Sequence, residues 1–179
     1  MKRLVFASSI AILLVISLAY AGGRLYFNTQ ERPFKVSILF GRKYDYDHIR
    51  VTKVIDGDTI ILADGERIRY IGVDTPELRR KVRGRWRYEP RPFAEDSTEF
   101  NRRLTEGKIV RLEFDVEKRD KYGRLLAYVY LEDGTFVNAE LLKQGYAQLV
   151  TIPPNLKYVD LFVSLQREAR QNNRGLWGR

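Results

Sequence analysis

The sequence has no cysteine and only one histidine, His48, among its 179 residues. The absence of cysteine excludes disulfide frameworks, thiol nucleophiles and thiolate zinc sites. A single histidine excludes multi-histidine metal sites and makes any catalytic triad depend on His48, which we expect to have no catalytic part. Any chemistry must therefore come mostly from carboxylates, arginine, lysine, tyrosine, hydroxyl groups or the backbone.

Charge of one sign is in excess, because 32 lysine and arginine residues stand against 23 aspartate and glutamate residues. A net charge of +9 favours a polyanionic partner, either a nucleic acid or an anionic surface. Hydrophobic residues make up 44% of the chain, which is enough for a packed core. The length predicts one domain with at most a short appendage.

The N-terminal segment has the pattern of an export signal. Lys2 and Arg3 precede an apolar run, and Ala19-Tyr20-Ala21 places small residues at −3 and −1 of a possible cleavage site. Residues 1–21 are therefore predicted to be a signal peptide or, if uncleaved, a membrane anchor of marginal length. Either way, we expect the protein to be exported, and secreted or tethered to the outer face of the membrane.

Residues 22–47 read as a linker or N-terminal extension, with a short apolar stretch at 36–40 that could add an edge strand. Residues 48–179 form the predicted folded domain. Its strands are expected at 49–51 with 54–55, 59–62, 67–73, 109–116 and 125–131, with 135–137 continuing after the turn at Asp133-Gly134.

Helices are predicted over 94–105, around Leu141 and Leu142 with Asn138 as its cap, and from about 158 to near Gly175. Tyr158, Phe162 and Trp177 are expected in the core. Residues 79–92 are predicted to be a basic loop. These elements indicate a small α+β domain, most economically a closed or nearly closed antiparallel barrel.

Three acidic clusters stand out in the domain, at Asp56-Gly57-Asp58, Asp74-Thr75-Pro76-Glu77 and Glu117 to Asp120. Gathered carboxylates repel one another unless protons or a cation intervene, and their hard oxygen atoms suit Ca²⁺ or Mg²⁺. The alternative is ordinary turn chemistry, in which Asp-Gly simply closes a turn. No twelve-residue EF-hand loop is present.

Two arginines are placed near these clusters. Arg69 lies five residues before Asp74, and Arg124 follows the tight turn Asp120-Lys121-Tyr122-Gly123. A cation, carboxylates and two arginine forks together suit phosphodiester hydrolysis, because arginine stabilises phosphate charge and a carboxylate can activate water. The alternative for each arginine alone is a surface ion pair.

Three motifs that follow one another in the chain identify a family more specifically than any one of them does alone. The stretches 54–60 (VIDGDTI), 69–77 (RYIGVDTPE) and 120–128 (DKYGRLLAY), followed by Val137-Asn138, resemble the staphylococcal nuclease family in order and spacing. The resemblance covers roughly residues 49–178. It implies a five-stranded OB-fold β-barrel with three helices, and a Ca²⁺-dependent endonuclease that hydrolyses DNA and RNA with no obligate protein partner.

The same resemblance implies the site residues. Asp58 and Asp74 would supply carboxylates to Ca²⁺ and Thr75 its backbone carbonyl, with Asp56 in the outer shell. Glu77 would act as general base or position the attacking water for in-line attack, which leaves 3′-phosphate ends. The scissile phosphate would be held by Arg69 and Arg124, and a neighbouring phosphate by Lys121 and Tyr122.

Two departures from the family are visible. Residues 148–155 lack the two stacking tyrosines of staphylococcal nuclease, which puts base preference in doubt. The loop after Glu77 is longer and more basic, and we expect its Lys and Arg side chains and one aromatic to bind substrate, namely Arg79, Arg80, Lys81, Arg83, Arg85, Trp86 and Arg87. Trp86 or Tyr88 is a candidate replacement for the stacking surface.

Two other functions remain open from the sequence. The first is a non-catalytic nucleic-acid-binding OB-fold module, since staphylococcal-nuclease-like repeats can bind without cutting once their site residues are lost. The second is a membrane-surface protein whose basic loop binds anionic lipid, which leaves the acidic clusters unexplained. Retention of Asp58, Asp74, Glu77, Arg69 and Arg124 favours the nuclease.

Overall fold

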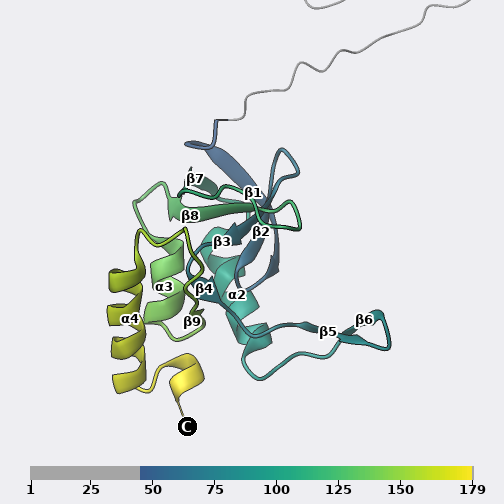
Figure 1. Ribbon diagram of the computed structural model, residues 1–179, viewed down its shortest axis with the longest axis vertical. Coiled ribbons are helices and arrows are strands. Elements are labelled where there is room, and N and C mark those ends of the chain that lie inside the picture. The colour runs from purple at the N-terminus through teal and green to yellow at the C-terminus, as the bar shows by residue number, and fades with distance from the viewer. Residues whose placement is uncertain (1–44, 179) are drawn as a thin grey trace, which may run out of the picture. The chain divides into compact units, whose positions relative to one another are not determined.

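A computed structural model describes residues 45–178 of the chain (Figure 1). The predicted signal or anchor at 1–21 and nearly all of the predicted linker at 22–47 lie outside the described residues. No helix between residues 45 and 178 has both the length and the apolar character needed to cross a bilayer.

Five strands close into a barrel in the order β1-β2-β3-β8-β7. They are β1 (Ile49–Asp56), β2 (Thr59–Leu62), β3 (Arg67–Tyr70), β7 (Ile109–Glu113) and β8 (Leu125–Leu131). The predicted five-stranded barrel is confirmed and has the OB-fold form. The expectation of a wholly antiparallel barrel is wrong at one seam, because β3 and β8 pair in parallel.

Three helices lie against the barrel, namely α2 (Ala94–Thr105), α3 (Val137–Lys143) and α4 (Val159–Gln171), with a short 3₁₀ turn η1 (Gly175–Trp177) after them (Figure 1). The bounds of α2 are those predicted for a helix over 94–105. The strand expected at 135–137 is wrong, because α3 begins at Val137 and only one isolated bridge, Tyr130 to Phe136, forms there.

Asn138 is not a helix cap but a buried bridge inside α3. Its amide donates to the Ile71 carbonyl at 2.8 Å, and its side-chain oxygen accepts from the Val129 N–H at 3.0 Å. The side chain satisfies two backbone groups that the barrel alone leaves unpaired. It thereby joins α3 to β8 and to the segment that leaves β3.

The core fills the barrel and the space under α3 and α4. Alternate barrel residues such as Val51, Ile60 and Ile68 are completely buried, as is Leu141 of α3. Phe162 is buried as predicted, and Tyr158 packs edge-on against Tyr128 with ring centroids 4.7 Å apart. Trp177 lies at the periphery of the domain, half-buried, with the Arg170 guanidinium 4.2 Å from its ring.

The strand predicted over 67–73 is divided at Gly72. Gly72 has φ +80°, and a Cβ there would lie 2.5 Å from the Phe162 ring of α4. Only glycine accepts both the left-handed backbone and the close approach. The chain therefore turns and continues as β4 (Val73–Asp74), which pairs with β9 (Gln148–Leu149) and carries Asp74 toward the acidic turns.

The predicted basic loop contains a β-hairpin formed by β5 (Arg79–Val82) and β6 (Arg85–Tyr88). The hairpin projects away from the barrel beside α2 (Figure 1). Sequence patterning missed it because alternation of basic and aromatic residues marks no buried face. The turn residues Arg83 and Gly84 both have positive φ, which suits a two-residue hairpin turn.

Candidate active site

Asp58 is the centre of a turn between β1 and β2. Its carboxylate is buried and accepts hydrogen bonds from the Thr75 N–H at 2.9 Å, the Thr75 hydroxyl at 3.0 Å and the Thr59 hydroxyl at 3.1 Å. These donors hold both carboxylate oxygens in place. Residues from the first two acidic clusters, 17 positions apart, are therefore joined through Asp58 and Thr75.

Gly57 permits this contact between the two turns. A Cβ at Gly57 would lie 2.7 Å from the Thr75 side chain, well inside the normal contact distance. The neighbouring Asp56 carboxylate accepts the Asp58 N–H at 3.2 Å and so caps the same turn. Its backbone carbonyl accepts from the Asn101 amide of α2 at 3.0 Å, which ties the end of β1 to the helix.

Arg69 of β3 lies between two of the predicted metal ligands. One terminal nitrogen forms an ion pair with Asp58, and the other donates to Asp74 at 2.7 Å. The Arg69 side chain is 17% exposed, whereas that of Asp74 is 58% exposed. Burial lowers the pKa of the Arg69 guanidinium, and the neighbouring carboxylates act in the opposite direction.

Arg124 reaches the same place through the parallel pairing of β3 with β8. Ile68 pairs with Leu125, so Arg124, one residue earlier, lies at the start of β8 beside β3. Asp120 orients it, accepting from Arg124 Nε at 2.7 Å and from its backbone N–H at 3.0 Å. Burial alone would raise the pKa of the Asp120 carboxyl, but its hydrogen bonds from Arg124 and Tyr122 lower it overall.

Glu77 lies at the wall of a cavity of about 690 Å³ that these side chains share. Its lining includes seven of the residues predicted for metal binding, catalysis and substrate binding, but not the predicted ligands Asp74 and Thr75; the seven are Asp56, Asp58, Arg69, Glu77, Trp86, Tyr122 and Arg124. Desolvation raises the pKa of the Glu77 carboxyl, and the charge of Asp56 raises it further. Burial likewise raises the pKa of the Asp56 carboxyl, against the positive charges of Arg69 and Arg124.

The other predicted residues lie around this cavity. Lys121, together with Arg69, Tyr122 and Arg124, lines an adjoining cavity of about 420 Å³ whose apolar wall includes Val150 and Ile152. Arg79, Arg80 and Lys81 line a third cavity of about 520 Å³. Arg83, Arg85 and Arg87 are exposed on the hairpin and line none of these three cavities.

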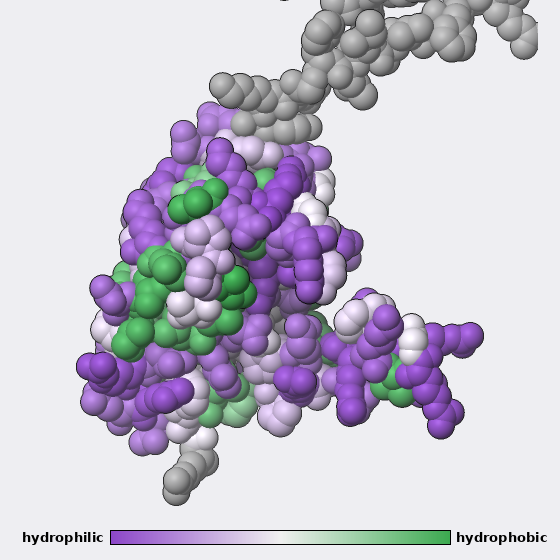
Figure 2. Space-filling view, in the orientation of Figure 1, coloured by the Kyte–Doolittle hydropathy of each residue, from purple (hydrophilic) through white to green (hydrophobic). Residues whose placement is uncertain are grey.

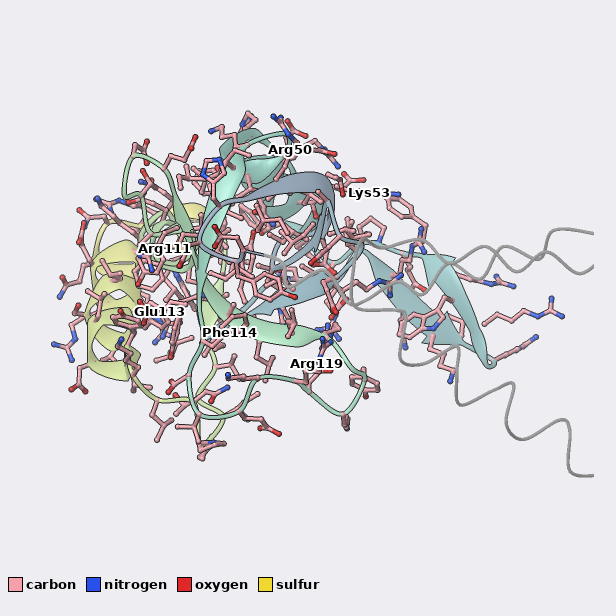
Figure 3. The ribbon with its side chains drawn as sticks, turned by 90° about the horizontal axis from the view of Figure 1, so that it is seen from above. Arg50, Lys53, Arg111, Glu113, Phe114 and Arg119 are labelled. Carbon is pink, nitrogen blue, oxygen red and sulfur yellow. The ribbon has the colours of Figure 1, made fainter. Side chains whose placement is uncertain are left out.

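The third acidic cluster does not join the first two. Asp120 pairs with Arg124, and the Glu117 N–H instead donates to the Asn155 side chain at 2.8 Å. Sequence reasoning also missed a bidentate pair in which Arg119, labelled in Figure 3, contacts Glu66 at 2.8 and 3.0 Å. Arg119 also donates to the Gly123 carbonyl at 2.7 Å, which fixes the turn that carries Arg124.

The donor types near Arg69 fit a hard divalent cation, because they are carboxylate, hydroxyl and carbonyl oxygens. Asp56, Asp58, Asp74 and Glu77 bring four carboxylates, and Arg69 and Arg124 bring two guanidinium groups. Negative charge is therefore in excess. Within residues 45–178, however, no three histidine, cysteine or acidic side chains gather closely enough to form a metal cluster, and the Arg69 guanidinium bridges Asp58 and Asp74.

Comparison with known proteins decides the family. Residues 67–179 match the profile described as staphylococcal nuclease homologue. The chain belongs to the staphylococcal nuclease family. It is 42% identical to a thermonuclease of Staphylococcus intermedius over 150 residues, which cover 82% of this chain and 84% of that protein. It is also 33% identical to a thermonuclease of Staphylococcus hyicus over 99% of both chains.

Another relative is the endonuclease YncB of Bacillus subtilis, 38% identical over 74% of this chain and 62% of its own length. Membership of this family and its thermonuclease and endonuclease relatives make the chain a nuclease, a hydrolase of phosphodiester bonds. The resemblance inferred from the three motifs is confirmed. The cavity that gathers Arg69, Glu77 and Arg124 is its candidate active site.

Proposed function

We propose that this nuclease hydrolyses DNA and RNA by in-line attack of water, depends on Ca²⁺ and leaves 3′-phosphate ends. The observation that carries the proposal is the cavity in which Glu77, Arg69 and Arg124 meet beside Asp56 and Asp58. A carboxylate with a raised pKa and two guanidinium groups line this one cavity. Those are the groups that a water attack on a phosphodiester requires in a site without histidine.

Glu77 is the proposed base. Its carboxylate accepts a proton from water, and its raised pKa makes it a stronger acceptor than an ordinary glutamate. Arg124 is the proposed phosphate ligand that is ready in the structure, because Asp120 occupies Nε while the terminal nitrogens make no hydrogen bond within residues 45–178. An oriented guanidinium binds two phosphate oxygens and stabilises the charge that grows on them.

Asp58, Asp74 and the Thr75 carbonyl are the proposed Ca²⁺ ligands, with Asp56 in the outer shell. When bound, the cation would neutralise these carboxylates and polarise a phosphate oxygen. The Arg69 N–H groups, which now bridge Asp58 and Asp74, would then be available to the scissile phosphate. Lys121 and Tyr122 are proposed to contact the neighbouring phosphate, and the basic hairpin to hold the rest of the strand.

We further propose that the protein is exported, with residues 1–21 as a cleaved signal or a retained anchor and 22–47 as a linker before the domain at 48–179. Support comes from the charged, apolar and small-residue order of the first 21 positions. Mass measurement of the protein recovered from medium and membrane fractions distinguishes the two forms. A chain that stays in the cytosol with its N-terminus intact would contradict export.

The activity is tested by incubating plasmid and single-stranded DNA and RNA with the protein in Ca²⁺ or in chelator. The proposal expects cleavage only with Ca²⁺, and products that a polymerase cannot extend until a phosphatase removes the 3′-phosphate. Cleavage in chelator would contradict the metal requirement. Substrate that is bound but intact under every condition would favour the non-catalytic binding module.

A further inference from the structure

The cavity lined by Arg79, Arg80 and Lys81, called the second cavity from here on, lies at the base of the hairpin next to the catalytic cavity. It measures about 520 Å³, and its walls include Glu77, Trp86 and Arg91. Glu77 and Trp86 also line the catalytic cavity, so the two spaces adjoin at these two side chains. Figure 2 shows the hairpin as a largely hydrophilic arm that stands off from the body of the domain. A strand that passes Trp86 from the catalytic cavity therefore enters the second cavity.

Backbone hydrogen bonds fix the hairpin relative to Glu77. The Arg91 N–H donates to the Glu77 carbonyl at 3.0 Å, and the Glu89 N–H donates to the Leu78 carbonyl at 3.1 Å. The β5–β6 ladder continues directly from these bonds, with Arg79 opposite Tyr88. The second cavity is thus built on the same stretch of backbone that positions the proposed base.

The charge of the hairpin is suited to a polyanion. Residues 79–91 contain seven basic residues and one acidic residue, Glu89, which lies 3.4 Å from Arg80. The ladder places Arg80 directly opposite Arg87, and like charges in that position destabilise a strand pair. Figure 3 shows side chains that end in nitrogen along the whole projecting ribbon. Phosphate groups between these side chains would relieve the repulsion.

Trp86 provides an apolar face among these charges. The residue is 68% exposed, and it lies opposite Lys81 on one face of the ribbon. Within residues 45–178, no aromatic ring stacks on it and no cation covers it. Tyr88 differs, because its hydroxyl contacts the Glu95 carboxylate of α2. Tyr88 is 63% exposed but lines neither of these two cavities, so of the two aromatics Trp86 is the one placed to stack a base between them.

We propose that the second cavity is a nucleotide subsite for the part of a single strand that leaves the catalytic cavity. A base stacks on Trp86, and the following phosphates contact Arg79, Lys81 and Arg91. Aromatic faces beside basic groups bind single strands in this way. The inference rests on the proposed function and deepens it, because it makes the enzyme favour substrates long enough to span both cavities.

The test compares a dinucleotide with a 12-nucleotide single strand as substrates in Ca²⁺. Trp86→Ala is expected to lower kcat/KM on the 12-mer about 5- to 150-fold more than on the dinucleotide, the loss of one stacked base. Trp86→Phe keeps a ring and is expected to retain most of the preference. Arg167→Ala, which removes an exposed charge from α4, is the matched control and is expected to leave both rates unchanged.

Binding of a fluorescent 12-mer to proteins that also carry Glu77→Gln gives a readout independent of cleavage. Removing both Arg79 and Lys81 is expected to make the dependence of log affinity on log salt shallower by about 1.4, the sum for two phosphate contacts to a single strand. If wild type cuts neither substrate in Ca²⁺ but Trp86→Ala still weakens 12-mer binding, the proposed Ca²⁺-dependent cleavage of single strands fails and the subsite stands. Equal effects of Trp86→Ala on both substrates, or no effect on 12-mer binding, would overturn the subsite.

Discussion

Asn138→Ala is predicted to destabilise the domain strongly while leaving the active-site residues unchanged. Asn138 has no solvent exposure, and its two hydrogen bonds, at 2.8 and 3.0 Å, satisfy the Ile71 carbonyl and the Val129 N–H. Removing the amide leaves one buried acceptor and one buried donor without a partner. At about 1–3 kcal/mol for each unsatisfied group, the expected loss is about 2–6 kcal/mol, a large share of the ~5–15 kcal/mol typical of a domain.

The assay is urea unfolding at pH 7, followed by tryptophan fluorescence and far-UV circular dichroism together. Asn138→Asp is the matched variant, because it keeps the acceptor for Val129 but cannot donate to Ile71. At pH 7 its buried carboxylate would also face the Ile71 carbonyl oxygen, so it should destabilise the domain at least as much as Asn138→Ala. A loss below about 1 kcal/mol for Asn138→Ala would refute the reasoning, since it would mean that water or a backbone shift replaces both bonds.

Further predictions concern the turns, the pH dependence and the unused histidine. Gly57→Ala should lower stability by about 1–3 kcal/mol in thermal unfolding and reduce cleavage, because its Cβ would separate the turn of Asp58 from Thr75; an unchanged melting temperature would contradict this. Asp120→Asn should lower kcat about 10- to 150-fold in steady-state kinetics, since Arg124 loses a charged partner; a wild-type rate would show that Arg124 needs no such support. Burial raises the pKa of Tyr70 well above 10, so Tyr70 stays protonated in the fold while it ionises in the unfolded chain. The free energy of unfolding should therefore fall above pH 10, and Tyr70→Phe should make that fall shallower by about 1.4 kcal/mol per pH unit; an identical slope in both proteins would be the contrary result. His48→Ala should leave the cleavage rate unchanged, and a slower enzyme would give His48 a role that the structure does not indicate.

Most of the barrel could be predicted from local patterns. The strands at 59–62 and 125–131 and the helix at 94–105 have the predicted bounds, because apolar periodicity and Asp-Gly or Gly107 turns mark them. What the patterns did not predict depends on partners distant in sequence. The parallel pairing of Ile68 with Leu125 is one case, and the division of 67–73 by contact between Gly72 and Phe162 is another.

In the candidate site, too, local motifs could be predicted and contacts between distant residues could not. The motifs around Asp58, Arg69 and Glu77 identified residues that line one cavity. The hydrogen bonds that hold the site in place could not be predicted from the sequence. Thr75 donates to Asp58 only where two separate turns meet, and Arg119 donates to Glu66, 53 positions away. The basic hairpin was predicted as a loop, since strand prediction relies on a buried face and every side chain of β6 is exposed.

The most direct test of the central claim is the single-turnover cleavage rate of a single-stranded oligonucleotide by wild type and Glu77→Gln, with binding measured on the same preparations. Glu132→Gln, an exposed carboxylate outside the catalytic cavity, is the control. The account predicts a rate about 10²- to 10⁴-fold lower for Glu77→Gln with affinity within a few-fold of wild type. A Glu77→Gln rate equal to that of Glu132→Gln would contradict it.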